Sequence, residues 1–138
     1  MIELVPPHSV YFGHPINFYN TAKEAELIEI IQKEFPGFDI ENPNQTHHTR
    51  NYLEWKKEKG SGMAYFFDIV LPGCEKGVFM SFEDGMFGAG VFGEAEAMQR
   101  MERPIYELNV RGIIIPMLID YSRKLSIEET RERVYGKK

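Results

Sequence analysis

The sequence contains very little cysteine and no hydrophobic segment of membrane-spanning length. Cys74 is its single cysteine, which excludes an intramolecular disulfide and provides no second thiolate for a cysteine-type zinc site. The most apolar late stretch, residues 113–119, is interrupted by Pro116 and falls far short of the ~20 residues that a transmembrane helix needs. The N-terminus lacks the basic start and apolar stretch of a signal peptide. These absences predict a soluble cytoplasmic protein without a membrane partner.

Basic residues are also in the minority. The 138 residues include 16 Lys and Arg against 21 Asp and Glu, which gives a formal net charge of −5. Nucleic-acid polymers are bound by concentrated positive charge, so this balance argues against DNA or RNA as a partner. A free nucleotide remains possible, because a single loop can bind one phosphate whatever the net charge. The length and the 43% of hydrophobic residues predict one domain over residues 1–138.

Hydrophobic patterns predict short strands that alternate with helices. The predicted strands cover residues 10–12, 38–40, 78–82 and 104–108, and the predicted helices cover residues 22–35, 50–59, 63–70, 91–102 and 127 onward. Thr21 and Ser126, each followed by a glutamate three positions later, are typical helix N-caps. Such alternation indicates parallel strands with helices on both faces. We therefore expect an α/β fold, a three-layer sandwich with a flavodoxin-like or Rossmann-like sheet of four or five strands.

Two loops follow predicted strands at the edge where open parallel sheets bind ligands. The first comprises residues 13–17 and the second residues 83–90. Gly88 and Gly90 in the second loop allow the backbone to approach a ligand closely. Glu94 is then predicted on the first turn of a helix, where free amides and the helix dipole favour its ionised form and keep it available as a nucleophile. Acids are also common in first turns without any such role.

Four sequence blocks stand out by their order and spacing. They are residues 10–16 (VYFGHPI), 78–85 (VFMSFEDG), 90–94 (GVFGE) and 103–106 (RPIY). Together they resemble the nucleoside 2-deoxyribosyltransferase superfamily, which includes nucleoside 5′-monophosphate N-glycosidases. Its members typically have a first strand ending in a Gly-Pro-like turn, a second ending near Asp-Gly, and a glycine shortly before a glutamate, with Lys-Pro after it.

The resemblance implies a chemistry for the chain. In the superfamily the glutamate attacks the anomeric carbon of a ribosyl or deoxyribosyl group and expels the base, and a second base or water resolves the covalent glycosyl-enzyme. By this resemblance Glu94 is the nucleophile, Asp84 orients the sugar hydroxyls or Glu94, and Asp68 assists departure of the base. The expected substrate-binding residues are Tyr11, Gly13, His14, Pro15, Phe87, Gly88 and Gly90. The resemblance also implies a homo-oligomer without a cofactor.

Several alternatives remain open. A non-catalytic module that binds a nucleotide or nucleotide sugar is the second candidate, because fold does not determine function. The residues do not separate ribose from deoxyribose, nucleoside from monophosphate, or transfer from hydrolysis. The spacing of the four histidines does not indicate a metal site. His48 and Arg50 could reach the site from the loop after the second predicted strand, but His48 is interpreted as a surface residue.

Overall fold

Five short strands form one sheet in the computed structural model, which describes residues 8–43, 45–59 and 65–136. The strands are β1 (Ser9–Gly13), β2 (Asp39–Glu41), β3 (Lys76–Met80), β4 (Ile105–Leu108) and β5 (Ile114–Pro116). Their spatial order is β2-β1-β3-β4-β5; the first four strands pair in parallel, and β5 runs antiparallel to β4. This is the flavodoxin-like order, so the expected α/β class and mostly parallel sheet are confirmed.

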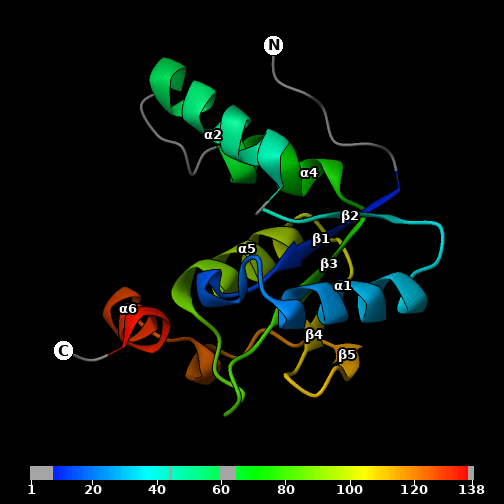
Figure 1. The fold of residues 1–138 in the computed structure, drawn as a ribbon, viewed down its shortest axis with the longest axis vertical. Helices are drawn as coiled ribbons and strands as arrows, with labels where there is room; N and C mark the ends of the chain where they lie inside the picture. Colours follow the sequence, from blue (N-terminus) through cyan, green and yellow to red (C-terminus); the bar gives the residue numbers. More distant parts are fainter. Residues whose placement is uncertain (1–7, 44, 60–64, 137–138) are drawn as a thin grey trace.

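Helices cover both faces of the sheet and complete a three-layer sandwich. In Figure 1, α1 lies on one side of the sheet and α5 on the other, while α2 and α4 lie beyond β2. The α-helices are α1 (Ala22–Glu34), α2 (Thr46–Lys59), α4 (Leu71–Gly73), α5 (Ala89–Arg100) and α6 (Ile127–Tyr135). A π-helical segment, η2 (Phe66–Val70), precedes α4, and η1 (Ile16–Phe18) and η3 (Tyr121–Arg123) are short 3₁₀ helices.

The central strand β1 contributes to two hydrophobic cores. Successive side chains of a strand point to opposite faces, so Val10 and Phe12 pack with Leu27 and the rest of the α1 face. Tyr11 points the other way and packs with Phe92 and neighbouring side chains of the α5 face. All five side chains are fully buried. An almost uninterrupted apolar strand is what burial on both faces requires.

The local signals at helix starts are confirmed, whereas some element bounds differ from the predictions. The side chain of Thr21 accepts a hydrogen bond from the Glu24 amide, and Ser126 forms a complete capping box with Glu129. The strand predicted over residues 78–82 is β3 and ends at Met80, because the amide of Phe82 instead bonds to Met86 across a turn. Likewise, α2 begins four residues before the predicted start at Arg50.

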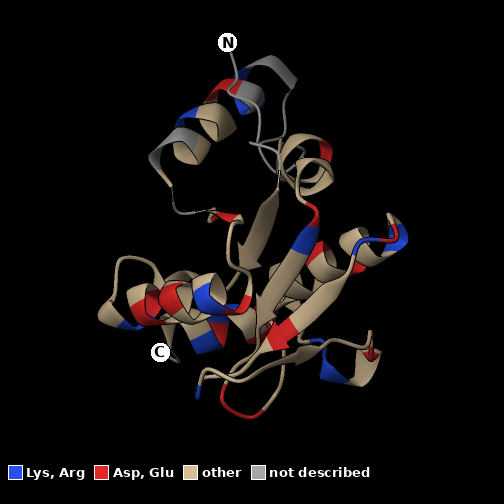
Figure 2. Ribbon diagram, turned by 90° about the vertical axis from the view of Figure 1, so that its right-hand side faces the viewer, with Lys and Arg blue, Asp and Glu red and all other residues tan. Residues whose placement is uncertain are grey.

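The outer surface carries charges of both signs. In the view of Figure 2, acidic and basic segments are interspersed over the described helices and loops. Ile113, Ile115 and Leu118, around the edge strand β5, are exposed apolar residues. None of the helices in the described part of the chain is long and apolar enough to cross a membrane.

Two glycines provide a test of this packing. An ideal Cβ on Gly77 would lie 2.5 Å from Cε2 of Phe79 and 2.6 Å from Sδ of Met98, whereas one on Gly93 of α5 meets nothing within 4 Å. We expect Gly77→Ala to lower the free energy of unfolding by about 1–3 kcal/mol through overpacking. Gly93→Ala should raise it by about 0.5–1 kcal/mol through helix propensity. Urea denaturation measures both, and a Gly77→Ala protein as stable as the wild type would contradict this packing.

Candidate active site

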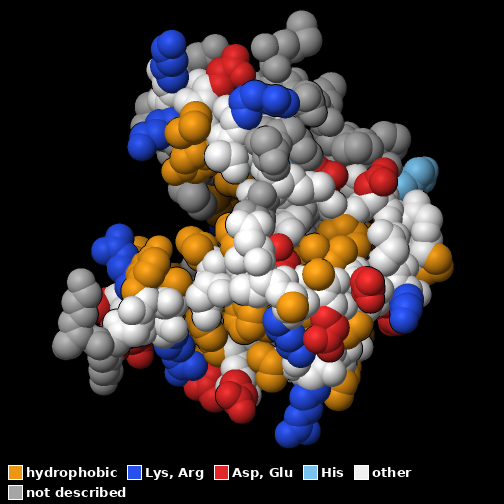
Figure 3. Space-filling view, viewed as in Figure 1, with side chains coloured by type: hydrophobic (Ala, Val, Ile, Leu, Met, Phe, Trp, Pro, Cys, Tyr) orange, Lys and Arg blue, Asp and Glu red, His pale blue; other side chains and the backbone are white. Residues whose placement is uncertain are grey.

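A cavity of about 440 Å³ lies beyond the carboxyl ends of β1, β2 and β3. The chain order reverses at this place, because β2 and β3 lie on opposite sides of β1, and open α/β sheets bind ligands at such points. The walls come from the loop after β1 and from α2, α5 and α6. Figure 3 shows a hollow between the α2 and α6 regions, with hydrophobic side chains along its edges. Its size is that of a small-molecule site.

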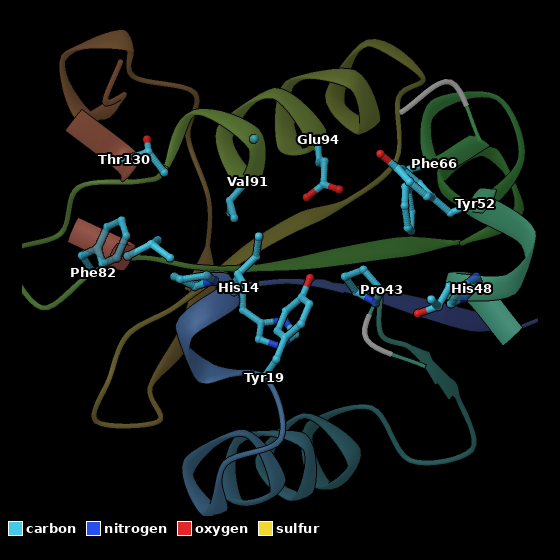
Figure 4. A pocket seen from close by; sticks show the side chains of 16 residues that line it. His14, Tyr19, Pro43, His48, Tyr52, Phe66, Phe82, Val91, Glu94 and Thr130 are labelled. Atoms are coloured by element: carbon cyan, nitrogen blue, oxygen red, sulfur yellow. The ribbon is translucent and has the colours of Figure 1, made fainter. Parts of the chain in front are cut away.

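Glu94 projects from α5 into this cavity (Figure 4). The hydroxyl of Tyr11, a fully buried residue of β1, donates a hydrogen bond of 2.5 Å to Oε2 of Glu94. Gly13, at the end of the same strand, lies close to the other oxygen, because an ideal Cβ there would be 3.1 Å from Oε1. Strand β1 therefore holds one carboxyl oxygen and leaves space around the other.

The ionisation of Glu94 differs from the sequence expectation. Helix α5 begins at Ala89 with Gly88 as its N-cap, so Glu94 lies in the second turn, beyond the free amides of the first. Burial raises the pKa of Glu94 to about 7, and the hydrogen bond from Tyr11 only partly opposes this. Burial and the charge of Glu94 also raise the pKa of Tyr11, which keeps its donating proton. Near neutral pH the Glu94 carboxyl group is divided between protonated and ionised forms.

Most of the predicted site residues are brought together at this cavity. His14, Pro15, Gly88 and Gly90 line it with Glu94. Tyr11 and Gly13 lie directly behind the carboxyl group, where they contact Glu94.

Three other predicted site residues do not line the cavity. Asp84 is exposed, and the pKa of its carboxyl group is lowered chiefly by two hydrogen bonds of 2.8 Å from Arg133. Asp68 is exposed on η2. Phe87 is fully buried, with its ring 4.8 Å from the Arg123 guanidinium. The geometry therefore gives Asp84 and Phe87 structural contacts and leaves Asp68 at the surface.

Helix α6 closes one end of the cavity with Thr130 and Val134. The hydroxyl of Thr130 accepts a hydrogen bond of 2.9 Å from the Ala89 amide, at the start of α5. The Asp84–Arg133 ion pair joins the same helix to the loop after β3. Asp84, which was expected to orient a sugar, therefore anchors the helix that forms one wall of the cavity.

His14 is fixed by contacts on both ring nitrogens. Nε2 lies 2.7 Å from Oε2 of Glu24, and Nδ1 lies 3.2 Å from the carbonyl oxygen of Phe12. The ring also stacks on the Phe12 ring with 4.0 Å between centroids. Burial lowers the pKa of His14, although the hydrogen bond to Glu24 opposes the shift. His14 therefore fixes the loop after β1 and directs both nitrogens into the protein.

His48 is buried and lines the cavity, which corrects its interpretation as a surface residue and agrees with the alternative that it reaches the site. It is only 1% exposed, and its ring nitrogens contact the Tyr65 hydroxyl at 2.5 Å and Oε1 of Glu41 at 2.9 Å. Asn51 donates to the same hydroxyl at 3.1 Å. A helix that begins at Thr46 places His48, Asn51 and Tyr52 on one face, because residues three and four positions apart are neighbours on a helix. This spacing is the sequence signal that could have placed His48 in the interior.

Aromatic side chains that the sequence analysis did not assign complete the cavity wall. Tyr52 and Phe66 lie at the end formed by α2 and η2, with ring centroids 6.1 Å apart, and Tyr19 lies on the side opposite Glu94 (Figure 4). Phe82 lines the end near α6. The site thus has one carboxyl group in largely apolar surroundings that include Tyr and Phe rings, which suits a flat, uncharged ring system.

No family model, curated protein or solved structure matches the chain. Among residues 8–43, 45–59 and 65–136, no three His, Cys, Asp or Glu side chains gather into a cluster that could hold a metal ion. Functional inference therefore depends on the cavity and on Glu94.

The raised pKa of Glu94 predicts a pH-dependent stability. The folded protein holds this proton more tightly than the unfolded chain, so stability falls as pH rises from about 4.5 to about 7. Glu94→Gln keeps an acceptor for Tyr11 but removes the ionisation. We expect the wild type to lose roughly 3 kcal/mol relative to Glu94→Gln across this interval. Chemical denaturation at several pH values measures the difference, and a constant difference would show that burial does not raise this pKa.

Proposed function

We propose that the protein cleaves or transfers the N-glycosidic bond of a small nucleoside or nucleoside monophosphate, with Glu94 as the nucleophile. The observation that carries this proposal is the Glu94 carboxyl group. It projects into the cavity beyond the carboxyl ends of the strands, and Tyr11 holds one of its oxygens. The sequence resemblance assigns the nucleophile to the same residue. The aromatic lining supports a site for a nucleobase, because base rings pack well against aromatic side chains.

The chemical step uses the ionised form of Glu94. Its free oxygen attacks the anomeric carbon, the carbon–nitrogen bond breaks, and the bonding electron pair leaves with the base. The transition state resembles an oxocarbenium ion, so a carboxylate below the sugar stabilises the developing positive charge before it forms the covalent bond. Tyr11 holds the second oxygen and fixes the orientation of the nucleophile. A second base or water then resolves the glycosyl-enzyme.

A nucleotide or nucleotide-sugar binding module without catalysis is the second candidate. The observation that favours it is the position of Asp84 and Asp68 outside the cavity, because glycosidases generally use a second carboxyl group beside the nucleophile. Both candidate functions use the same cavity, and they differ in whether a base is released. Homo-oligomer formation stays a prediction under either function.

Base release tests the catalytic proposal. The purified protein is incubated with nucleosides and their 5′-monophosphates, with and without an acceptor base, and free base is measured by chromatography. We expect release by the wild type and a loss of about 10³-fold or more in Glu94→Gln. Glu96→Gln, on the same helix but bonded to Tyr121 outside the cavity, should retain activity. A thermal shift with one of these compounds but no base release would instead establish the binding module.

The pH profile gives an independent signature of the nucleophile. Because Glu94 must be ionised to attack, kcat/KM should rise with pH through an apparent pKa of about 7. An ordinary exposed glutamate would already be fully ionised in that range. Initial rates at low substrate concentration between pH 5 and pH 9, roughly two units either side of this pKa, test the assignment. A profile that is flat through neutrality would be incompatible with Glu94 as the ionising nucleophile.

A further inference from the structure

The cavity contains the proposed nucleophile but neither of the predicted acidic partners. Asp68, expected to assist departure of the base, is exposed on η2 and does not line the cavity. A base that leaves as an anion in largely apolar surroundings needs a hydrogen-bond donor. We propose that Tyr19 is this donor, an inference that rests on the proposed function.

The position of Tyr19 is fixed by its neighbours. It directly follows η1, and its backbone amide bonds to the carbonyl oxygen of Ile16 at 2.9 Å. Its ring lies against the His14 ring, with 4.9 Å between centroids and 49° between planes. Since Glu24 holds His14 in turn, the Tyr19 ring is supported by a buried hydrogen-bonded pair. Such support preorganises a side chain before a ligand binds.

The hydroxyl of Tyr19 is directed into the cavity. Figure 4 shows Glu94 extending from α5 on one side and the Tyr19 hydroxyl pointing toward it from the other. Within the described part of the chain, no residue forms a hydrogen bond with this hydroxyl. Burial, followed by the charges of Glu94 and Glu24, raises the pKa of Tyr19 well above its usual value. The group therefore keeps its proton and can donate it in a hydrogen bond to a ligand.

Three other polar side chains of the wall, those of His14, His48 and Thr130, use their polar atoms within the protein. His14 contacts Glu24 and Phe12, and His48 contacts Glu41 and Tyr65. Thr130 accepts from the Ala89 amide and donates to the Ser126 carbonyl oxygen. Tyr19 differs from these three in having a hydroxyl that faces Glu94 and is not engaged by a described residue. Tyr52 also lines the cavity, but from the end formed by α2 and η2 and not from the side opposite Glu94.

The placement of the Tyr19 hydroxyl across the cavity from Glu94 suits a role toward the leaving group of a displacement reaction. A nucleophile and a departing group lie on opposite sides of the anomeric carbon, so a donor across from Glu94 faces the base. Oε1 of Glu94 bonds to the carbon, the carbon–nitrogen bond breaks, and the electron pair passes to the base. Tyr19 donates a hydrogen bond to the base nitrogen or oxygen that bears this charge and retains its proton. Water protonates the released base, and the resulting hydroxide hydrolyses the glycosyl-enzyme.

A series of leaving groups tests the role of Tyr19. The substrates are uridine, 5-fluorouridine, adenosine, their 2′-deoxy forms, and 4-nitrophenyl riboside, whose leaving group is stable without a donor. Tyr19→Phe keeps the ring against His14 and removes only the hydroxyl. We expect kcat to fall about 10²-fold for the poorest leaving group and much less for 4-nitrophenyl riboside. This ratio between substrates does not depend on the fraction of folded protein.

Tyr106→Phe is the matched control, because Tyr106 packs on Phe35 in the α1-side core, outside the cavity, and its variant should keep all rates. Equal slowing of every substrate by Tyr19→Phe, or no slowing, would overturn the donor role. Base release by the wild type would then still support the proposed function. A wild type that releases no base from any nucleoside or nucleoside 5′-monophosphate would overturn both proposals.

Discussion

The hydrogen bond from Tyr11 to Glu94 is the interaction on which the site depends, because it partly offsets the cost of burying a carboxyl group in an apolar cavity. It also connects the central strand to α5 across one face of the sheet. The position of the carboxyl group therefore depends on the parallel pairing of β1 with β2 and β3. Gly13 adds a second requirement, since a side chain there would crowd the free oxygen of Glu94.

The polar side chains around the cavity divide into those that point into it and those that support its wall. Glu94 and Tyr19 direct polar atoms into the cavity, whereas His14 and His48 direct theirs into the protein. The supporting groups satisfy buried donors and acceptors and thereby hold the loops of the wall in one conformation. This arrangement leaves few polar side-chain atoms directed into a largely apolar cavity.

Features encoded by neighbouring residues could be predicted from the sequence, and features that depend on distant partners could not. The N-caps at Thr21 and Ser126 and the α/β class follow from local patterns, and so does the placement of Glu94 after a glycine-containing loop. Asp84 was predicted to have a chemical role because the sequence does not reveal its partner, Arg133, which lies 49 positions further along the chain. The contacts of His48 were missed for the same reason, because folding brings together β2, α2 and the residue before η2.

The attachment of α6 to the rest of the protein is sensitive to dissolved salt. The side chains of Asp84 and Arg133 are 49% and 35% exposed, so dissolved ions weaken their attraction. The hydrogen bond between Thr130 and Ala89 lies nearer the cavity and is uncharged, and salt affects it little. Ionic strength therefore acts on the ion pair and not on the hydrogen bond, so added salt weakens one of the contacts that hold this wall of the cavity.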